Sequence, residues 1–325
     1  MNIFNREISI DLMKFLAVFL IINSHMDALY TQYSQLATGG SIGDALFLFC
    51  SGYTLLLGKE QKFDLWYKRR INRIYPSVII CAIMGCLFSG KDNITLLKLG
   101  GGEFVLAIMV YYILLYLIKK YALAHLSLIF GCLILISILV YIFFFPYKYE
   151  TGEKGMYGIT TLYRWIPYFG FMLLGSWCGL HRAKIKSNLW QDILYFCISL
   201  IMFYGIQYFA TMNKTIASWQ IITLAPLNGI VYYCYKICKA TFWNNVIKNR
   251  KVYISIIFIS GISLESYLIQ YSVFTTSMND IFPFNLLIMV IIVISASYLC
   301  KILSTWFSQT FSNEEYDYRK IIKYW

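Results

Sequence analysis

Residues 122–146 read ALAHLSLIFGCLILISILVYIFFFP, a run without a single Asp, Glu, Lys or Arg. A helix needs about 20 mostly apolar residues to cross the hydrocarbon core of a bilayer, so this stretch predicts a transmembrane helix. The composition of the whole chain agrees, because 59% of its 325 residues are hydrophobic and only 14% are charged. A soluble domain carries about 25% charged residues, and this chain therefore cannot cover itself with a polar surface.

Further apolar runs precede and follow this one. The sequence therefore predicts an all-α fold, a polytopic transmembrane helical bundle of about ten spans that forms a single integral-membrane domain over residues 1–325. The predicted spans cover residues 8–29, 41–58, 75–90, 103–119, 122–146, 162–180, 189–211, 215–235, 252–275 and 281–307.

The Lys and Arg residues predict the orientation of these helices. If the N-terminus is inside, most of the 28 Lys and Arg residues fall in cytoplasmic segments. The outer loops then hold only Lys91, Lys98, Lys148, Lys154, Arg164 and Lys214. Cytoplasmic loops of membrane proteins carry such an excess, so we expect both termini in the cytoplasm. The net charge of +12 then reflects anchoring on anionic lipid rather than nucleic-acid binding.

Polar residues inside predicted spans are the first candidates for function, because placing them in a bilayer is costly. In the first span, Lys14 and His25 project from one face of a helix, about 16 Å apart along its axis. His25 is the candidate general base, since the other two histidines fall near the predicted inner interface. The alternative is that Lys14 reaches the inner headgroups and His25 only bonds a neighbouring helix.

The second span and the basic segment after it hold further candidates. Asp44 lies at the outer edge of the second span, near the level of the histidine if neighbouring spans are antiparallel. Ser51 lies in a small-residue stretch that permits close helix packing, which is also sufficient to explain it. Arg70 and Arg73 are three residues apart and would share a helix face. Guanidinium groups suit phosphate, although anchoring of the topology is an alternative explanation.

Five stretches, in order along the chain, resemble the motifs of the acyltransferase-3 family, bacterial membrane enzymes that typically O-acetylate cell-surface glycans. Asp11, Lys14 and His25 stand where the family has an Asp, an Arg and a His. Residues 44–53 resemble its D-L-F-F-x-L-S-G-F stretch, residues 70–76 its R-x-x-R-I-x-P stretch, residues 163–175 its R-x-P-F-x-x-G span and residues 262–270 its S-x-x-I-Y-L-x-H span. The likeness covers nearly the whole chain.

Two positions depart from the family pattern. Lys14 keeps the positive charge of the family's Arg but lacks its bidentate fork. Gln270 stands where the family has a late His, and an amide cannot act as an acid or a base.

The resemblance implies an O-acyltransferase that carries an acyl group, typically acetyl, from cytoplasmic acetyl-CoA to a sugar hydroxyl. The acceptor would be a surface polysaccharide or a lipid-linked glycan, and the enzyme would lie in the bacterial cytoplasmic membrane. The implied donor-binding residues are Arg69, Arg70 and Arg73, which would hold the phosphates of CoA. The implied catalytic residues are Lys14 on the thioester, His25 as general base, and Asp44 or Glu265 orienting the imidazole. The implied acceptor-binding residues are Ser51, Tyr53, Arg164 and Gln270. No metal and no nucleic acid is expected.

A transporter or glycan flippase is the alternative, because many spans with intramembrane charges fit that class too. Transporters often contain repeated halves with interrupted helices at matching positions. The sequence contains no convincing repeat between residues 1–160 and 161–325, and its polar stripe is concentrated near the N-terminus. Consumption of a thioester would separate the enzyme from the transporter.

Overall fold

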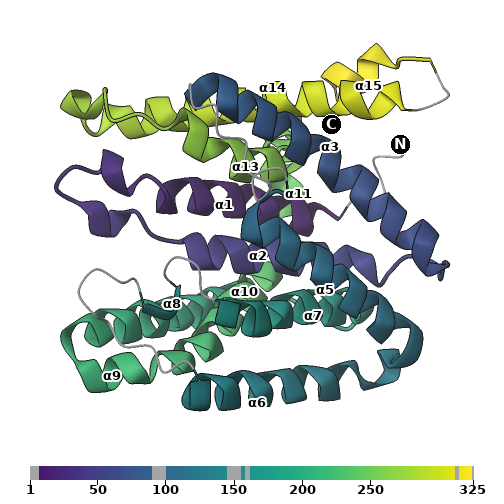
Figure 1. Ribbon diagram of the computed structural model, residues 1–325. Helices are drawn as coiled ribbons and strands as arrows, with labels where there is room; N and C mark the ends of the chain where they lie inside the picture. Colours follow the sequence, from purple (N-terminus) through teal and green to yellow (C-terminus); the bar gives the residue numbers. More distant parts are fainter. Residues whose placement is uncertain (1–6, 90–99, 145–154, 158–161, 312–314, 324–325) are drawn as a thin grey trace. The chain divides into compact units, whose positions relative to one another are not determined.

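The computed structural model describes residues 7–89, 100–144, 155–157, 162–311 and 315–323. Every regular element in these ranges is a helix, which confirms the predicted all-α class (Figure 1). Five of the cations behind the predicted orientation lie outside the described residues: Arg6, Lys91, Lys98, Lys148 and Lys154. The last residues of the predicted spans 75–90 and 122–146 lie outside them too.

The α-helices are α1 (Ile8–Ser24), α2 (Gly40–Leu55), α3 (Phe63–Ser89), α5 (Gly102–Tyr121), α6 (Leu126–Phe144), α7 (Trp165–Leu180), α8 (Leu189–Met212), α9 (Lys214–Ser218), α10 (Leu224–Cys238), α11 (Phe242–Val246), α12 (Arg250–Gly261), α13 (Ser263–Val273), α14 (Phe284–Thr310) and α15 (Tyr318–Ile322). Short 3-10 helices lie between them: η2 (Asp27–Leu29), η3 (Ser34–Leu36), η4 (Leu123–His125), η5 (Gly155–Tyr157), η6 (Leu162–Arg164), η7 (Gln220–Thr223) and η8 (Asn279–Ile281).

Each predicted span coincides with at least one helix. In the described part of the chain, six helices are long and apolar enough to cross a bilayer, namely α3, α5, α6, α8, α10 and α14, some together with a flanking 3-10 turn. The bent pair of α12 and α13 is a seventh if it counts as one span. Three more, α1, α2 and α7, have 16 or 17 residues. The number of crossings and the side of the termini stay predictions.

The exposed faces of these helices are apolar. On α6, Phe143 and Phe144 are each 74% exposed and Leu128 is 65% exposed. Water-soluble monomers rarely expose contiguous apolar surface of this kind, whereas hydrocarbon tails solvate it at no cost. The helices and their apolar faces together indicate a multi-pass membrane protein.

The chain forms two compact units, each assembled from segments that are distant in the sequence. The first unit contains residues 1–13, 44–60 and 111–245, and the second contains residues 14–43, 61–110 and 246–325.

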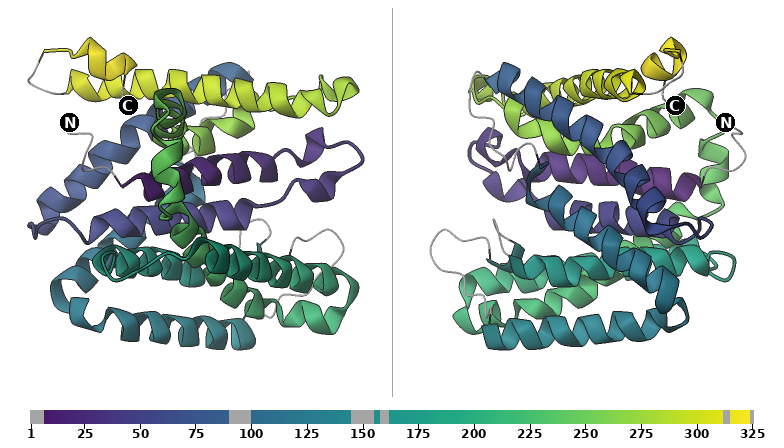
Figure 2. Two further views of the ribbon diagram at one scale, coloured as in Figure 1. Left: turned by 180° about the vertical axis from the view of Figure 1, so that it is seen from behind. Right: turned by 45° about the vertical axis from the view of Figure 1, so that its right-hand side comes forward.

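In the first unit, α8 packs along α10 and α6 packs along α7 (Figures 1 and 2). The C-terminal part of α2 packs on α7 through glycines that leave no room for a side chain. A Cβ at Gly52 would meet the backbone carbonyl of Met172, and a Cβ at Gly175 would meet that of Phe49. This close backbone approach is the packing that small residues permit in membrane helices.

In the second unit, α3, α13 and α14 pack against one another (Figures 1 and 2). Cys81 of α3, Ile269 of α13 and Cys300 of α14 meet in one buried apolar cluster. A second cluster joins Ile22 at the end of α1 to Val293 of α14. Burying such side chains fixes where the last turns of α1 and α13 lie.

Three boundaries differ from the predicted spans. The first span ends as a helix at Ser24 rather than at residue 29, and α3 begins at Phe63, so the basic segment before residue 75 is itself helical. The span 252–275 is not one helix, because α12 and α13 are bent by 68°. The break follows the pair Ser260 and Gly261, a combination at which helices commonly kink.

Candidate active site

His25 lies in the turn that directly follows α1, and its ring faces a tyrosine from α13. The hydroxyl oxygen of Tyr271 is 2.6 Å from His25 Nδ1 and 3.1 Å from Nε2. The centroids of the two rings are 4.6 Å apart. The sequence alone does not predict this contact, because His25 and Tyr271 are separated by 246 positions in the chain.

The backbone around His25 is held by asparagine side chains from three places in the second unit. Asn23 donates to the carbonyls of Leu36 and Thr38 at 2.8 and 3.0 Å. Asn279 donates to Ala28 O at 3.0 Å, and the buried Asn285 donates to Leu29 O at 2.9 Å. A buried amide that loses its partner costs about 1–3 kcal/mol, so the bond of Asn285 in particular holds the turn that follows His25.

Lys14 lies in α1, half-buried, in the same unit as His25. Residues 14–24 are helical, whereas His25 lies in the turn after the helix, so the predicted stripe is helical only as far as Ser24. At 1.5 Å per residue, Lys14 is about 15 Å along the axis from the end of α1. The predicted role of Lys14 at the thioester stays a prediction.

Glu265 lies in the first turn of α13, just after the break, and is fully buried. Its Oε1 accepts from Ser77 Oγ at 2.5 Å and pairs with Lys301 Nζ at 3.0 Å. Among the described residues, no hydrogen bond reaches its Oε2. Glu265 is a predicted partner of His25, and the structure gives it a cationic partner, Lys301. The sequence could have indicated Lys301 as a candidate, because it is a charged residue inside the predicted span 281–307.

Gln270, which stands in place of the family's late His, is also fully buried. Its Nε2 donates to the carbonyl of Tyr267 in its own helix at 3.3 Å. The next residue, Tyr271, is the one whose side chain reaches His25. Although Gln270 replaces the family's His, this turn of α13 still places a polar group, the hydroxyl of Tyr271, next to the imidazole.

The arginines of the basic segment lie on the N-terminal half of α3. Arg69 and Arg73 are exposed, and Arg70 is half-buried with its guanidinium carbon 5.1 Å from the centre of the Trp66 ring. Because the segment is helical, Arg70 and Arg73 share a face, as the spacing predicted. Two guanidinium groups in this arrangement can donate hydrogen bonds to phosphate oxygens.

The remaining candidates lie in the first unit. The positive charge of Arg164 attracts the carboxylate of Asp44. The guanidinium carbon of Arg164 is 5.8 Å from the centre of the Tyr168 ring. Ser51 Oγ is 2.9 Å from the hydroxyl of Tyr112. The Ser51–Tyr112 contact joins α2 to α5 within the first unit.

Tyr53 is buried, and Tyr235 donates a hydrogen bond to its hydroxyl at 3.3 Å. Tyr53 therefore packs against Tyr235 of α10. For Ser51, close helix packing is the alternative that the sequence left open. The predicted acceptor contacts of Ser51, Tyr53, Arg164 and Gln270 stay predictions.

Two hollows lie in the described residues near these elements. In the second unit, a groove of about 800 Å³ runs between the end of α13 and α14, lined by apolar side chains such as Phe88, Phe274 and Ile291. Tyr271 and Ser295 also line it. The groove therefore shares one residue, Tyr271, with the surroundings of His25.

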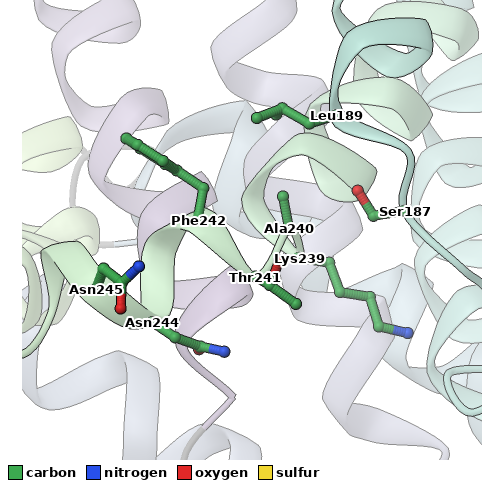
Figure 3. Close-up of a pocket in the computed structure, with 8 residues that line it drawn as sticks. All are labelled: Ser187, Leu189, Lys239, Ala240, Thr241, Phe242, Asn244 and Asn245. Atoms are coloured by element: carbon green, nitrogen blue, oxygen red, sulfur yellow. The ribbon is translucent and has the colours of Figure 1, made fainter.

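In the first unit, a cavity of about 560 Å³ lies beside the end of α10 (Figure 3). Its one cation, Lys239, donates to the carbonyls of Arg182 and Ile185, the latter at 2.8 Å. Burial lowers the pKa of Lys239, and the charge of Arg182 acts in the same direction. The ammonium group thus ties the connection between α7 and α8 to the end of α10.

The chain matches a known protein family over most of its length. The profile of an acyltransferase domain, that of the acyltransferase-3 family, matches residues 7–306. The chain belongs to the acyltransferase-3 family. The match includes segments of both units and confirms the resemblance of the five motifs. Neither the curated proteins nor the solved structures contain a significant match to the chain.

Membership makes this chain an acyltransferase by family. The described residues of the acyltransferase domain contain no group of three or more His, Cys, Asp and Glu side chains placed to hold a metal ion. The second unit contains two pairs of polar groups: the imidazole of His25 with the phenol of Tyr271, and the buried carboxylate of Glu265 with Lys301.

Proposed function

We propose that this chain is a membrane O-acyltransferase that carries an acyl group, acetyl in the first instance, from cytoplasmic acyl-CoA to a sugar hydroxyl. The observation that supports this most directly is the imidazole of His25, held at the end of α1 by a fixed turn, in a chain of the acyltransferase-3 family. A histidine is the side chain best suited to general-base work near neutral pH.

The donor is held by the cations of α3. Arg69, Arg70 and Arg73 bind the phosphates of CoA, supported by their helical spacing and by the exposure of Arg69 and Arg73. Lys14, in the N-terminal half of α1, orients the thioester. Its ammonium group stabilises the negative charge that develops on the carbonyl oxygen during attack.

The reaction is a single acyl transfer. His25 takes the proton of the acceptor hydroxyl as its oxygen forms a bond to the thioester carbon. The carbon–sulfur bond then breaks, and the imidazolium returns the proton to the sulfur of CoA. General-base assistance of this kind contributes about 10²–10⁴-fold to the rate.

The acceptor is a sugar hydroxyl of a surface polysaccharide or of a lipid-linked glycan. The apolar groove beside Tyr271 supports a lipid-linked acceptor, because it lies between membrane helices and can hold one hydrocarbon chain. The protein then resides in the bacterial cytoplasmic membrane, with about ten crossings and both termini inside, as the bias of Lys and Arg indicates.

A transporter or glycan flippase remains the second candidate, and one observation favours it. The bend of 68° between α12 and α13 is the kind of broken span that lines substrate sites in transporters. In such a protein, the buried pair of Glu265 and Lys301 at this break would bind the cargo or a coupled ion.

The deciding experiment combines purified protein, acetyl-CoA and glycan isolated from the producing cell. We expect wild-type protein to release free CoA and to add acetyl groups that mass spectrometry detects on the sugar. We expect folded His25→Ala protein to lose about 10²–10⁴-fold in rate. Unchanged activity in this variant would remove His25 as the base, and glycan movement across vesicles without CoA release would favour the flippase.

A further inference from the structure

We propose that the cavity beside the end of α10 binds the headgroup of an anionic phospholipid. This site belongs to the first unit alone and is independent of the acyltransferase reaction. The cavity has a volume of about 560 Å³ and lies where α8 begins and α10 ends. Both helices are long and apolar enough to cross a bilayer, so their ends at the cavity lie at the membrane surface, where lipid headgroups are.

The lining of the cavity has a polar and an apolar side. In the view of Figure 3, the ammonium group of Lys239 and the amide of Asn244 lie towards one side. Leu189 and Phe242 extend towards the other. Thr241, which also lines the cavity, and Asn244 are exposed, so their side chains can donate to a ligand that enters from outside. A ligand with a charged head and an apolar tail fits such a lining.

Lys239 is a half-buried cation, and no carboxylate in the described part of the chain lies within ion-pair distance of it. Its ammonium group donates to two neutral carbonyls, those of Arg182 and Ile185. Burial lowers the pKa of Lys239, and the charge of Glu7 opposes this effect without cancelling it. A phosphate in the cavity would supply the counter-charge that Lys239 lacks, because a lysine binds phosphate as a point charge.

Further positive charge surrounds the cavity. The connection between α7 and α8 carries the exposed residues Arg182, Lys184 and Lys186 and contains no carboxylate. The buried carboxylate of Asp192, in the first turn of α8, is already paired with Lys236 at 2.5 Å. The surroundings therefore attract anions, and basic pockets between membrane helices bind the headgroups of anionic lipids.

An apolar stripe on α8 begins beside the cavity. Leu189 lines the cavity, and the next residue, Trp190, is 81% exposed. Leu194 and Ile201, which are also exposed, follow Trp190 at helical spacing on the same face. A tryptophan at the end of a membrane helix is typical of headgroup depth. The stripe can therefore contact an acyl chain of a lipid whose headgroup lies in the cavity, which favours a phospholipid over a free phosphate.

The test is mass spectrometry of the intact full-length protein, released from a neutral detergent after titration with phosphatidylglycerol, phosphatidylcholine or inorganic phosphate. We expect one phosphatidylglycerol per chain to bind about tenfold more tightly than phosphatidylcholine, the value of one charged hydrogen bond. Inorganic phosphate should not displace it. Equal affinity for the two lipids would overturn the proposal, and displacement by inorganic phosphate would assign the cavity to a free phosphate instead.

Asn244→Asp tests the cavity itself, because it places a negative charge on an exposed side chain of the lining. We expect it to weaken phosphatidylglycerol binding about tenfold. The matched control is Asn213→Asp, the same change at the N-cap of α9, near the opposite end of α8, where Asp caps as well as Asn. This variant should keep the wild-type affinity. Equal affinities in Asn244→Asp and wild type, or equal losses in both variants, would contradict the proposal.

Lys239→Met removes the cation. Because Lys239 also ties the connection between α7 and α8 to the end of α10, the midpoint of thermal unfolding is measured first without lipid. Phosphatidylglycerol should raise the midpoint of the wild-type protein, since a ligand that binds only the folded state stabilises it. We expect no such rise in Lys239→Met. An equal rise in both proteins would show that the lipid binds elsewhere and would overturn the assignment.

Discussion

Lys301 Nζ lies 3.0 Å from Oε1 of Glu265, a carboxylate with no exposed surface. The lysine is 25% exposed, so its charge is mostly removed from solvent as well. Ser77 donates to the same oxygen at 2.5 Å and is itself 3.3 Å from the hydroxyl of Ser304. The pair and Ser77 therefore link α3, α13 and α14 at the first turn of α13, just after the break in the span.

Removing the lysine should destabilise the second unit strongly. Lys301→Met leaves the Glu265 carboxylate buried without a counter-charge, which costs about 3–5 kcal/mol. We expect a lower midpoint of thermal unfolding in detergent, measured by tryptophan fluorescence. Adding Glu265→Gln to this variant should restore most of the loss, because the buried charge is then gone.

The control for this pair is Lys320→Met, which breaks an exposed ion pair with Asp317 at 3.1 Å. Exposed pairs contribute little, so the midpoint should not change. Equal midpoints for Lys301→Met and wild type would show that Glu265 is protonated or paired elsewhere.

The glycine contact between α2 and α7 predicts a steric effect. Gly52→Ala places a methyl group against the backbone carbonyl of Met172, which only a shift of the helices can relieve. Overpacking of this kind costs about 1–3 kcal/mol or more. Gly131→Ala is the control, because nothing lies near its Cβ position in α6, and the change favours the helix. Similar midpoints for both variants would contradict the close packing.

The proposed donor site predicts a loss of affinity only for donors that carry the nucleotide phosphates of CoA. We expect Arg73→Ala to weaken CoA binding by about 10- to 100-fold, the value of a charged hydrogen bond, and Arg73→Lys to weaken it less. Affinity for acetylpantetheine, which lacks the nucleotide phosphates, should not change. The control is Arg319→Ala in the exposed α15. Equal CoA affinity in Arg70→Ala, Arg73→Ala and wild type would reduce the cluster to an anchor of topology.

The groove beside Tyr271 predicts discrimination between acceptors. Ser295 is exposed and lines the groove, so Ser295→Trp fills it. We expect KM for a lipid-linked glycan to rise while KM for a short soluble glycan stays constant. Leu287→Trp, at another exposed position of α14, should change neither. A uniform effect on both acceptors would contradict a hydrocarbon chain in the groove.

The class of the protein follows from the sequence alone. Transfer of a helix into a bilayer depends on the summed hydropathy of about 20 consecutive residues, a local quantity that can be read along the chain. The helices therefore lie where the apolar runs predict them, and the five motifs identify the family, since each is a short stretch of neighbouring residues. The helical spacing of Arg70 and Arg73 belongs to the same local information.

Helix ends and side-chain partners were decided only by the tertiary structure. The span 252–275 is interrupted after Gly261, although its apolar content is that of a continuous helix. Tyr271 and His25 are 246 residues apart, and Lys301 is 36 residues from Glu265. Such pairs form because buried apolar clusters bring distant turns together, and hydropathy contains no information on which faces meet. The first apolar run predicts that His25 lies within a membrane helix, whereas packing decides that α1 ends at Ser24 and that the His25 ring faces Tyr271 of α13.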